Sequence, residues 1–223
     1  MLLKSEDVKR IDKYAVEKLN MPEIMLMENA GIGLVKNVRD NKKNILIVCG
    51  KGNNGGDGLV LARQLLSRGN EPEVFIFGKE EQLKGSVKVN YDILKKMNCI
   101  ISFLKKDNNI ENFNVAMDKS DLVVDAVFGI GLSREIEGMY KDVINIINDS
   151  EKEILAVDTP SGFNCSTGEI FKTCIKAKKT VTFIGEKFGF ENKEASKYTG
   201  EIVVEQISIP IKIVEKILEN KHE

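Results

Sequence analysis

The chain has 223 residues, of which 42% are hydrophobic and 30% charged, a composition typical of one large α/β domain with a packed core. Lys and Arg number 33 against 34 Asp and Glu, and this near balance gives no indication of a nucleic-acid or anionic-membrane partner. The N-terminal segment lacks an apolar stretch, and no apolar run approaches the roughly 18–20 residues that span a bilayer. We therefore expect a cytoplasmic protein.

Two residue types exclude further classes of protein. The four cysteines, Cys49, Cys99, Cys165 and Cys174, form no CxxC pair, and Cys49 ends an apolar run, so we expect reduced thiols rather than a disulfide framework. The single histidine, His222, lies one residue from the end of the sequence, where tails are usually disordered. This position excludes Ser-His-Asp and Cys-His catalysis and any zinc site with several histidines.

Two helices are predicted at the start of the chain, within residues 5–40. Residues 5–19 place apolar side chains at helical spacing, with Ser5 in position to cap the N-terminus. Pro22 suits the first turn of a second helix, which continues to about residue 35.

From residue 44 the apolar period changes, and strands then alternate with helices. This alternation favours a parallel sheet with right-handed crossovers. No linker is long enough to divide the chain, so we expect one domain over residues 1–223 with seven or eight strands. The expected strands are 44–49, 74–78, 99–103, 121–129, 154–158, 179–185 and 201–207, and the expected later helices are 59–69, 83–97, 108–118 and 137–149, with a short helix from 214.

A glycine-rich segment, GKGNNGGDG, follows the first predicted strand at residues 50–58. Its glycines relax the steric limits on the backbone, and a helix is expected to begin directly after it, so the free N–H groups suit a phosphate. Taken alone, a purely structural turn explains such a segment equally well. It lacks both the GK[ST] ending of a Walker A loop and the GxGxxG spacing of a dinucleotide fingerprint. ATPase and ordinary dehydrogenase activities are therefore disfavoured.

Two aspartates, Asp125 and Asp158, lie where the fourth and fifth predicted strands end. In an open parallel sheet, ligands bind beyond the carboxyl ends of the strands. A buried charge without a partner is costly, so two carboxylates at adjacent strand ends favour a functional site. A helix-capping role is the alternative for either residue.

Five segments occur in the order found in the NAD(P)H-hydrate epimerases, also called the YjeF N-terminal domain family: MENAG, GNNGGDGLVLAR, DAVFGIGLSR, AVDTPSGFNCSTGE and TVTFIGEKFGF. On these motifs the chain resembles that family over nearly its whole length. The resemblance implies a Rossmann-like three-layer α/β/α sandwich with a mostly parallel central sheet of seven to eight strands.

The resemblance also implies an activity, which is epimerisation of the R and S forms of hydrated NADH and NADPH. An ATP- or ADP-dependent dehydratase specific for the S form can then restore the dinucleotide. This dehydratase is the implied functional partner, either as a separate chain or as a C-terminal domain of a longer protein. Relatives often form dimers, so a homodimer is a further expectation.

Site residues follow from the same motifs. The resemblance implies that residues 53–57 and 129–135 surround the dinucleotide, that Asp158 approaches the damaged ring, and that Asn54, Asp125 and Ser161 bind K⁺. One carboxylate among neutral oxygen donors suits a monovalent ion, whereas Mg²⁺ and Ca²⁺ sites recruit more negative charge. The implied substrate-binding residues are Asn53, Asn54, Gly55, Gly56, Asp57, Gly129, Ile130, Gly131, Leu132, Ser133, Arg134, Glu135 and Asp158.

Epimerisation must transiently open the carbon that carries the hydroxyl group, either by loss of hydroxide or by opening of the ring, and both routes need an acid and a base. Asp158 is the first candidate. Lys187, in IGEKFGF, is the second, with a plain surface lysine as the alternative interpretation. Glu28 and Asn29, in MENAG, suit pocket lining and helix packing equally well.

Two other functions stay open at this point. The glycine-rich segment alone is compatible with a nucleotide-dependent oxidoreductase or kinase, although no motif supplies a hydride acceptor or a lysine that contacts phosphate. The other alternative is a non-catalytic nucleotide-binding regulatory module, which an assay of epimer exchange with and without potassium would distinguish.

The chain departs from the family pattern near its C-terminus. The last predicted strand ends in EQISIP, where relatives usually have an acidic residue and Gly before Ile-Pro. We expect this departure to lie far from the site loops and to affect a local turn.

Overall fold

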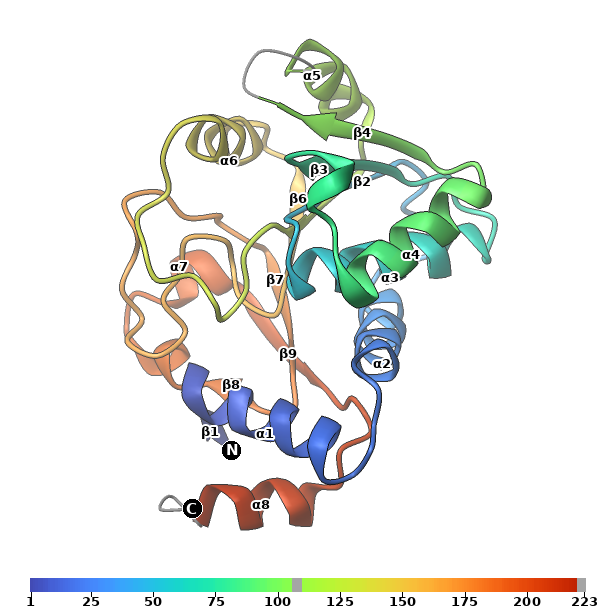
Figure 1. Cartoon of the computed structure of the whole chain (residues 1–223). Helices are drawn as coiled ribbons and strands as arrows, with labels where there is room; N and C mark the ends of the chain where they lie inside the picture. The colour runs from blue at the N-terminus through green and yellow to red at the C-terminus, as the bar shows by residue number, and fades with distance from the viewer. Residues whose placement is uncertain (106–109, 220–223) are drawn as a thin grey trace.

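The computed structural model describes residues 1–105 and 110–219. Its central sheet has seven strands, all parallel to their neighbours, in the order β4-β3-β2-β5-β6-β7-β9 (Figure 1). The order reverses between β2 and β5, which is the switch point of a doubly wound fold. The strands are β2 (Ile45–Cys49), β3 (Glu73–Phe77), β4 (Ile100–Leu104), β5 (Leu122–Ala126), β6 (Glu153–Val157), β7 (Lys179–Phe183) and β9 (Glu201–Glu205).

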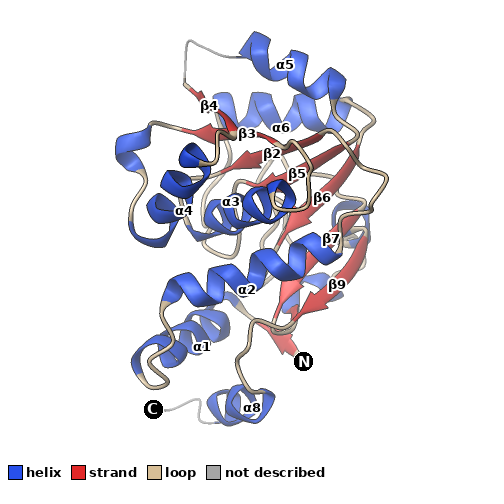
Figure 2. Cartoon of the chain, turned by 90° about the vertical axis from the view of Figure 1, so that its right-hand side faces the viewer, coloured by secondary structure: helices blue, strands red, loops and turns tan. Residues whose placement is uncertain are grey.

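Helices cover both faces of this sheet, because the central strands are apolar on both sides. In β2, Ile45, Ile47 and Cys49 belong to a core shared with α2, α3 and α4, whereas Leu46 and Val48 belong to a second core shared with α5 and α6. Figure 2 shows the resulting three layers. The predicted fold class is confirmed. The helices are α1 (Ser5–Glu17), α2 (Glu23–Lys36), α3 (Asn53–Leu66), α4 (Gly85–Lys96), α5 (Ile110–Lys119), α6 (Met139–Asp149), α7 (Ser196–Thr199) and α8 (Ile211–Glu219).

A second, two-stranded sheet lies outside the main one. Its strands are β1 (Leu2–Leu3) and β8 (Glu186–Lys187), which run parallel with Leu3 opposite Lys187. Helix α1 follows β1 directly, and the Arg10 guanidinium in α1 donates a hydrogen bond to the Ile217 carbonyl of α8 at 2.5 Å. The N-terminal segment is therefore fixed against the part of the chain that carries Lys187.

The start of α3 differs from the prediction. The helix begins at Asn53, inside the glycine-rich segment, rather than after Gly58. Glycine permits this because the segment lies against other backbone: a Cβ atom at Gly55 would lie 1.9 Å from the Gly50 carbonyl oxygen, and one at Gly58 would lie 2.7 Å from the Ala126 side chain. Close packing of helix on sheet, which sequence spacing does not reveal, sets the boundary.

Smaller differences concern the other ends. Lys4 rather than Ser5 is the N-cap of α1, and its backbone N–H donates to the Asp7 carboxylate at 3.0 Å. Residues 108 and 109 of the predicted helix at 108–118, and His222, lie outside the described residues.

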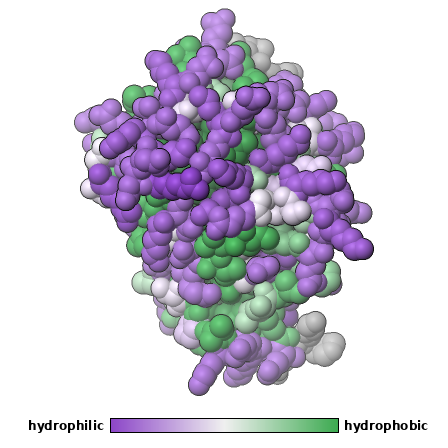
Figure 3. All heavy atoms as spheres, turned by 180° about the vertical axis from the view of Figure 1, so that it is seen from behind, coloured by the Kyte–Doolittle hydropathy of each residue, from purple (hydrophilic) through white to green (hydrophobic). Residues whose placement is uncertain are grey.

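Two broader expectations also have an outcome. All four cysteines are unpaired, as the sequence predicts. Over the described residues, no helix combines the length and the apolar character needed to cross a membrane. Figure 3, a view from behind Figure 1, shows a mostly hydrophilic upper surface with apolar side chains gathered lower on that face.

Candidate functional site

A cavity of about 890 Å³ lies at the switch point of the sheet. Its walls include Gly50, Val127 and Asp158, which directly follow β2, β5 and β6. Helix α1 and the first half of α2 form the opposite wall. The volume is in the range that protein ligand sites use, and the place is the one where doubly wound folds bind ligands.

Most of the residues proposed for substrate binding line this cavity, namely Asn53, Asn54, Asp57, Gly129, Ile130, Gly131, Leu132, Ser133, Arg134 and Asp158. Three of the proposed residues are not on its wall. Gly55 packs against backbone, a Cβ atom at Gly56 would lie 2.5 Å from the Met27 methyl carbon, and Glu135 forms an ion pair with Lys172. The two glycines bring α3 close to its neighbours, and Glu135 is half exposed beyond the cavity.

Asp158 and Lys187 form a buried ion pair at the cavity wall. The Lys187 ammonium lies 2.8 Å from Asp158 Oδ1 and also donates to the Phe183 carbonyl at 3.3 Å. The Thr182 hydroxyl donates to the same carboxylate oxygen at 3.1 Å. Because Lys187 has no exposed surface, the interpretation as a plain surface lysine is wrong.

The backbone of Asp158 is also unusual. Its φ is 63°, in the left-handed region that aspartate tolerates better than most side chains. Its N–H donates to the Val181 carbonyl at 2.8 Å, so β7 holds this conformation in place. Left-handed backbone at a non-glycine residue is costly and concentrates at functional sites.

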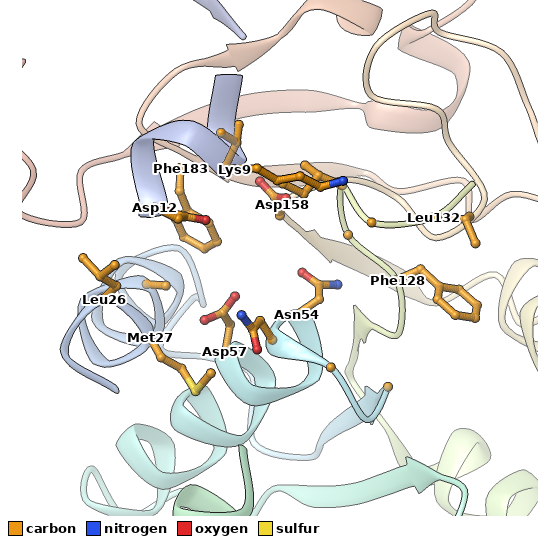
Figure 4. Close-up of a pocket in the computed structure, with 18 of the residues that line it drawn as sticks. Lys9, Asp12, Leu26, Met27, Asn54, Asp57, Phe128, Leu132, Asp158 and Phe183 are labelled. Atoms are coloured by element: carbon orange, nitrogen blue, oxygen red, sulfur yellow. The ribbon is translucent and has the colours of Figure 1, made fainter. Parts of the chain in front are cut away.

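Two further carboxyl groups point into the cavity, those of Asp12 and Asp57 (Figure 4). Burial, with the nearby Asp158 charge next in size, raises the pKa of Asp12 to about 6. Burial, again with Asp158 as the next cause, raises the pKa of Asp57 well above its usual range. Neither carboxyl has a hydrogen bond or an ion pair within the described part of the chain.

Asp12 is not among the site residues predicted from the sequence, although its position in α1 carries a signal. Val8, Ile11 and Ala15 are buried on one side of α1. Asp12 falls within the same i, i+3, i+4, i+7 stripe, where an apolar residue is expected. A charged residue inside an apolar stripe indicates either a buried partner or a cavity, and here it faces a cavity.

Asp125, Ser161 and Asn54 gather beneath the loop that follows β5. Asp125 is fully buried and accepts hydrogen bonds from the Ser161 N–H at 2.7 Å, the Ser161 hydroxyl at 2.6 Å and the Val127 N–H at 3.3 Å. Burial raises the pKa of Asp125 to about 6. Both amide atoms of Asn54 are buried without a hydrogen-bond partner, and a Cβ atom at Gly129 would lie 3.1 Å from the Asn54 oxygen. Across residues 1–105 and 110–219, no three His, Cys, Asp or Glu side chains are grouped so as to hold a metal ion.

The outer part of the cavity is basic. Lys9, Lys13, Lys51 and Arg134 line it and are exposed, and they outnumber the two exposed carboxylates on the same wall, Glu17 and Glu23. Cationic side chains at the mouth of a cleft attract anionic ligands and raise the rate of association. The cavity therefore combines a basic mouth with carboxyl groups deeper inside.

Glu28 and Asn29 do not line the cavity. Glu28 forms an ion pair with Arg63 and accepts a hydrogen bond from Gln64 at 2.6 Å, both in α3. The Asn29 amide donates to the Ile207 carbonyl at 3.3 Å. Of the two interpretations left open by the sequence, these contacts favour helix packing.

The EQISIP departure lies closer to the site than expected. Ile207 is on the cavity wall, so the expectation that this segment is remote from the site loops is wrong. Ser208 has φ 70°, the left-handed conformation that glycine adopts readily. Serine therefore adopts here a conformation that favours glycine.

Three comparisons with known proteins place the chain among relatives. The family model described as "YjeF-related protein N-terminus" matches residues 23–189. The chain is 37% identical over 213 residues to the NAD(P)H-hydrate epimerase of Lentilactobacillus buchneri, covering 92% of this chain and 93% of that protein. The crystal structure of the yeast protein ynu0 superposes with a TM-score of 0.80 at 22% identity, covering 97% of this chain and 93% of that one, and this likeness concerns the fold.

Other similar proteins are longer. The bifunctional NAD(P)H-hydrate repair enzyme Nnr of Moorella thermoacetica is 39% identical over 219 residues, which cover 96% of this chain but 41% of that protein. The chain thus spans about two fifths of the length of the bifunctional relatives it matches.

Proposed function

The chain belongs to the family described as YjeF-related protein N-terminus, and from this premise we propose that it interconverts the R and S epimers of hydrated NADH and NADPH. Relatives named NAD(P)H-hydrate epimerase, similar over most of their length, support the proposal. The observation that carries it is the buried Asp158–Lys187 pair on the wall of a large cavity at the switch point.

The cavity suits a dinucleotide. The free N–H groups at the start of α3, which begins at Asn53, favour a phosphate, since a helix N-terminus combines unpaired donors with a positive dipole end. The basic side chains at the mouth favour the same anionic groups. In this proposal residues 129–134 form the second wall around the phosphates, and the damaged ring lies deeper, near Asp158.

The chemistry requires a cationic ring or an opened ring for a short time. The hydroxyl group is on the carbon next to the ring nitrogen, so its departure leaves positive charge shared by that carbon and the nitrogen. A fixed carboxylate beside the ring stabilises this charge. Asp158 fills that role in the proposal, and Lys187 and Thr182 hold its carboxylate in one position.

We also propose that Asn54, Asp125 and Ser161 bind K⁺. These residues fit a monovalent cation on two grounds: Asp125 is a fully buried carboxylate without an ion pair among the described residues, and the buried Asn54 amide oxygen has no partner. A bound cation would neutralise Asp125 and supply positive charge close to the loop at 129–134. Oxygen donors with a single carboxylate suit an alkali ion.

The remaining expectations are part of the same proposal. Residues 1–223 form one domain that acts in the cytoplasm, beside an S-specific dehydratase on another chain or another part of a longer protein. Relatives named as bifunctional repair enzymes support a second repair activity next to this one. The exposed apolar side chains Met25 and Ile32 on α2 support a homodimer, which sedimentation would test.

The test compares wild type with Asp158→Asn. We expect the variant to keep its fold and to bind NADPH, but to lose most of its epimerisation, because the amide cannot stabilise positive charge as a carboxylate does. Loss of one positioned acid–base or charged group typically costs about 10²–10⁴ in rate. The two epimers are separated by chromatography. Full activity in the variant would remove Asp158 from the mechanism, and binding without any turnover in wild type would favour a regulatory module.

A further inference from the structure

One role in the proposed reaction has no residue yet. Either route through the reacting carbon needs a group that gives a proton to the hydroxyl oxygen. Lys187 is unsuited to this role, because its ammonium is fully buried and contacts Asp158 and the Phe183 carbonyl. Asp158 is ion-paired and serves as the charged partner. The acid must therefore be another group on the cavity wall.

Asp12 is placed for that role. Its carboxyl projects from α1 into the space that Asp57 and Asp158 also face (Figure 4). It makes no hydrogen bond or ion pair in the described part of the chain, so neither packing nor a structural contact accounts for a carboxylate in the apolar stripe of α1. Asp12 also lies outside residues 23–189, the segment that the family model matches.

The charges around Asp12 favour a protonated carboxyl close to neutral pH. The titratable and charged groups that line the same cavity are Lys9, Lys13 and Glu17 on α1, Glu23 on α2, Lys51 just before α3, Asp57 on α3, Arg134 after β5, Tyr140 on α6, Asp158 after β6 and Lys187 on β8. Lys187 is paired with Asp158, and the two α1 lysines are exposed. Burial and the Asp158 charge raise the pKa of Asp12 more than the Lys187 ammonium lowers it, in keeping with the rule that carboxyl groups sharing a site do not all ionise together.

The two unpaired carboxyls then differ in their suitability for proton transfer. A pKa of about 6 at Asp12 lets the group both give and regain a proton near neutral pH, which is the condition for effective acid–base catalysis. Burial raises the pKa of Asp57 well above its usual range, with Asp158 and Asp12 adding to the effect. The raised pKa of Asp57 favours its neutral form, which can donate a hydrogen bond to the bound dinucleotide.

We propose that Asp12 is a catalytic residue that exchanges a proton with the hydroxyl group of the hydrated nicotinamide, acting together with Asp158. This inference rests on the proposed epimerase function and adds to it the group that carries the proton.

The Asp12 carboxylic acid transfers its proton to the hydroxyl oxygen, the carbon–oxygen bond breaks with its electron pair going to oxygen, and water departs. The lone pair of the ring nitrogen forms the double bond to the carbon, so the ring carries one positive charge next to the Asp158 carboxylate. Water then adds to the other face of the ring: the new carbon–oxygen bond forms, the double-bond pair returns to nitrogen, and one proton from the water passes to Asp12 or, through solvent in the cavity, replaces the one it lost.

The experiment measures epimerisation by wild type, Asp12→Asn, Asp12→Glu, Asp57→Asn and Glu6→Gln across pH, with the uncatalysed rate subtracted. Glu6 is the matched control, since it is an exposed carboxylate on α1 that does not line the cavity. NADPH binding is followed by fluorescence titration, and stability by urea unfolding.

We expect Asp12→Asn to lower kcat by about 10²–10⁴ while the dissociation constant for NADPH changes less than about threefold. In wild type, kcat/KM should fall as pH rises through about 6, because the acid form of Asp12 is lost there. That fall should vanish in Asp12→Asn and persist in Asp12→Glu and Glu6→Gln.

Stability separates a catalytic role from a structural one. The pKa of Asp12 in the folded chain lies above the ordinary value of an aspartate, at about 6, so folding favours the protonated form, and this stabilisation is lost as pH rises from about 4 to about 6. Asp12→Asn should therefore be at least as stable as wild type at pH 7. A structural residue would instead lose stability on substitution.

Wild-type rates in Asp12→Asn, or the same pH dependence in that variant, would overturn the inference and leave the epimerase function intact. Loss of the pH-dependent fall in Asp57→Asn alone would assign the proton to Asp57 instead. A wild-type chain that binds NADPH without exchanging the epimers would refute the proposed function itself.

Discussion

Lys187 is a lysine without exposed surface, and its environment explains why it stays there. Its ammonium contacts Asp158 and the Phe183 carbonyl, and β1 covers the strand that carries it, with Leu3 paired opposite. A buried charge is tolerable only with such partners. The pair therefore couples the N-terminal segment of the chain to the carboxylate on the cavity wall.

Lys187→Met tests this coupling. We expect the free energy of unfolding in urea to fall by roughly 2–4 kcal/mol. This loss is at the low end for a broken buried ion pair, because water in the cavity can reach the unpaired Asp158. The double variant with Asp158→Asn should recover part of the loss, which a double-mutant cycle would measure. A single variant as stable as wild type would show that the pair contributes nothing to folding.

The roles of individual site residues could be predicted only where the residues belong to a motif that resembles the family. Asp158 and Asn54 stand in segments whose resemblance to a family supplies a role. For Lys187 the sequence left two interpretations, a catalytic residue or a surface lysine. Sequence spacing does not show that Leu2–Leu3 pairs with the short strand that carries Lys187. Asp12 was missed, since an isolated aspartate in a helix is ordinarily solvated and the cavity that receives it forms only in the folded chain.

Helices α2 and α3 cross at a close contact between Gly31 and Val60. A Cβ atom at Gly31 would lie 2.2 Å from one Val60 methyl group and 2.6 Å from its Cβ. Val60 is buried and branched at Cβ, so it has little freedom to move aside. This contact sets how near α2, which lines the cavity with Leu26 and Met27, comes to the start of α3.

Gly31→Ala should therefore destabilise the fold, although alanine is the better helix former. Overpacking costs about 1–3 kcal/mol and outweighs the gain of up to about 1 kcal/mol in helix propensity. Gly131→Ala is the control, because a Cβ atom there meets nothing within 4 Å, and its stability should change by less than about 0.5 kcal/mol. Equal urea midpoints for both variants would contradict this account of the contact.

At the level of elements, periodicity gave each strand of the main sheet to within a few residues, since buried parallel strands are nearly continuous apolar runs. It failed at the glycine-rich segment, where α3 starts at Asn53. A glycine-rich segment predicts a loop because glycine has a low helix propensity. Here the glycines are helical, and their lack of a side chain lets the backbone of α3 approach the sheet. It also gave no indication that β1 pairs with β8, since strands of two residues have no period.

In the whole molecule, the candidate site lies where the strand order of the sheet reverses. The strand order reverses between β2 and β5 (Figure 2), and the residues that follow β2, β5 and β6 line the cavity at this place. The parallel sheet follows from the alternation of elements, whereas its three layers were implied by the resemblance to the family. The cavity could not be predicted in this way, because one of its walls is α1, which lies far away in the sequence.

Binding of K⁺ should be visible in the stability of the whole fold. A ligand of the folded state alone stabilises it by about 2.7 kcal/mol at a hundred times its dissociation constant, so replacing choline by potassium at constant ionic strength should raise the Tm. Asp125→Asn should remove the effect, because it removes the buried negative charge. Asp118→Asn, an exposed carboxylate on α5, should keep it. A Tm that potassium does not change in wild type would contradict the proposed ion site.

The most direct test of the central claim starts from each hydrated NADH epimer separately. The purified wild-type chain is added in potassium buffer, and the ratio of R to S forms is followed by chromatography beside a blank without protein. We expect both samples to reach the same ratio, far sooner than the blank. Samples that bind the dinucleotide yet drift only at the rate of the blank would contradict it.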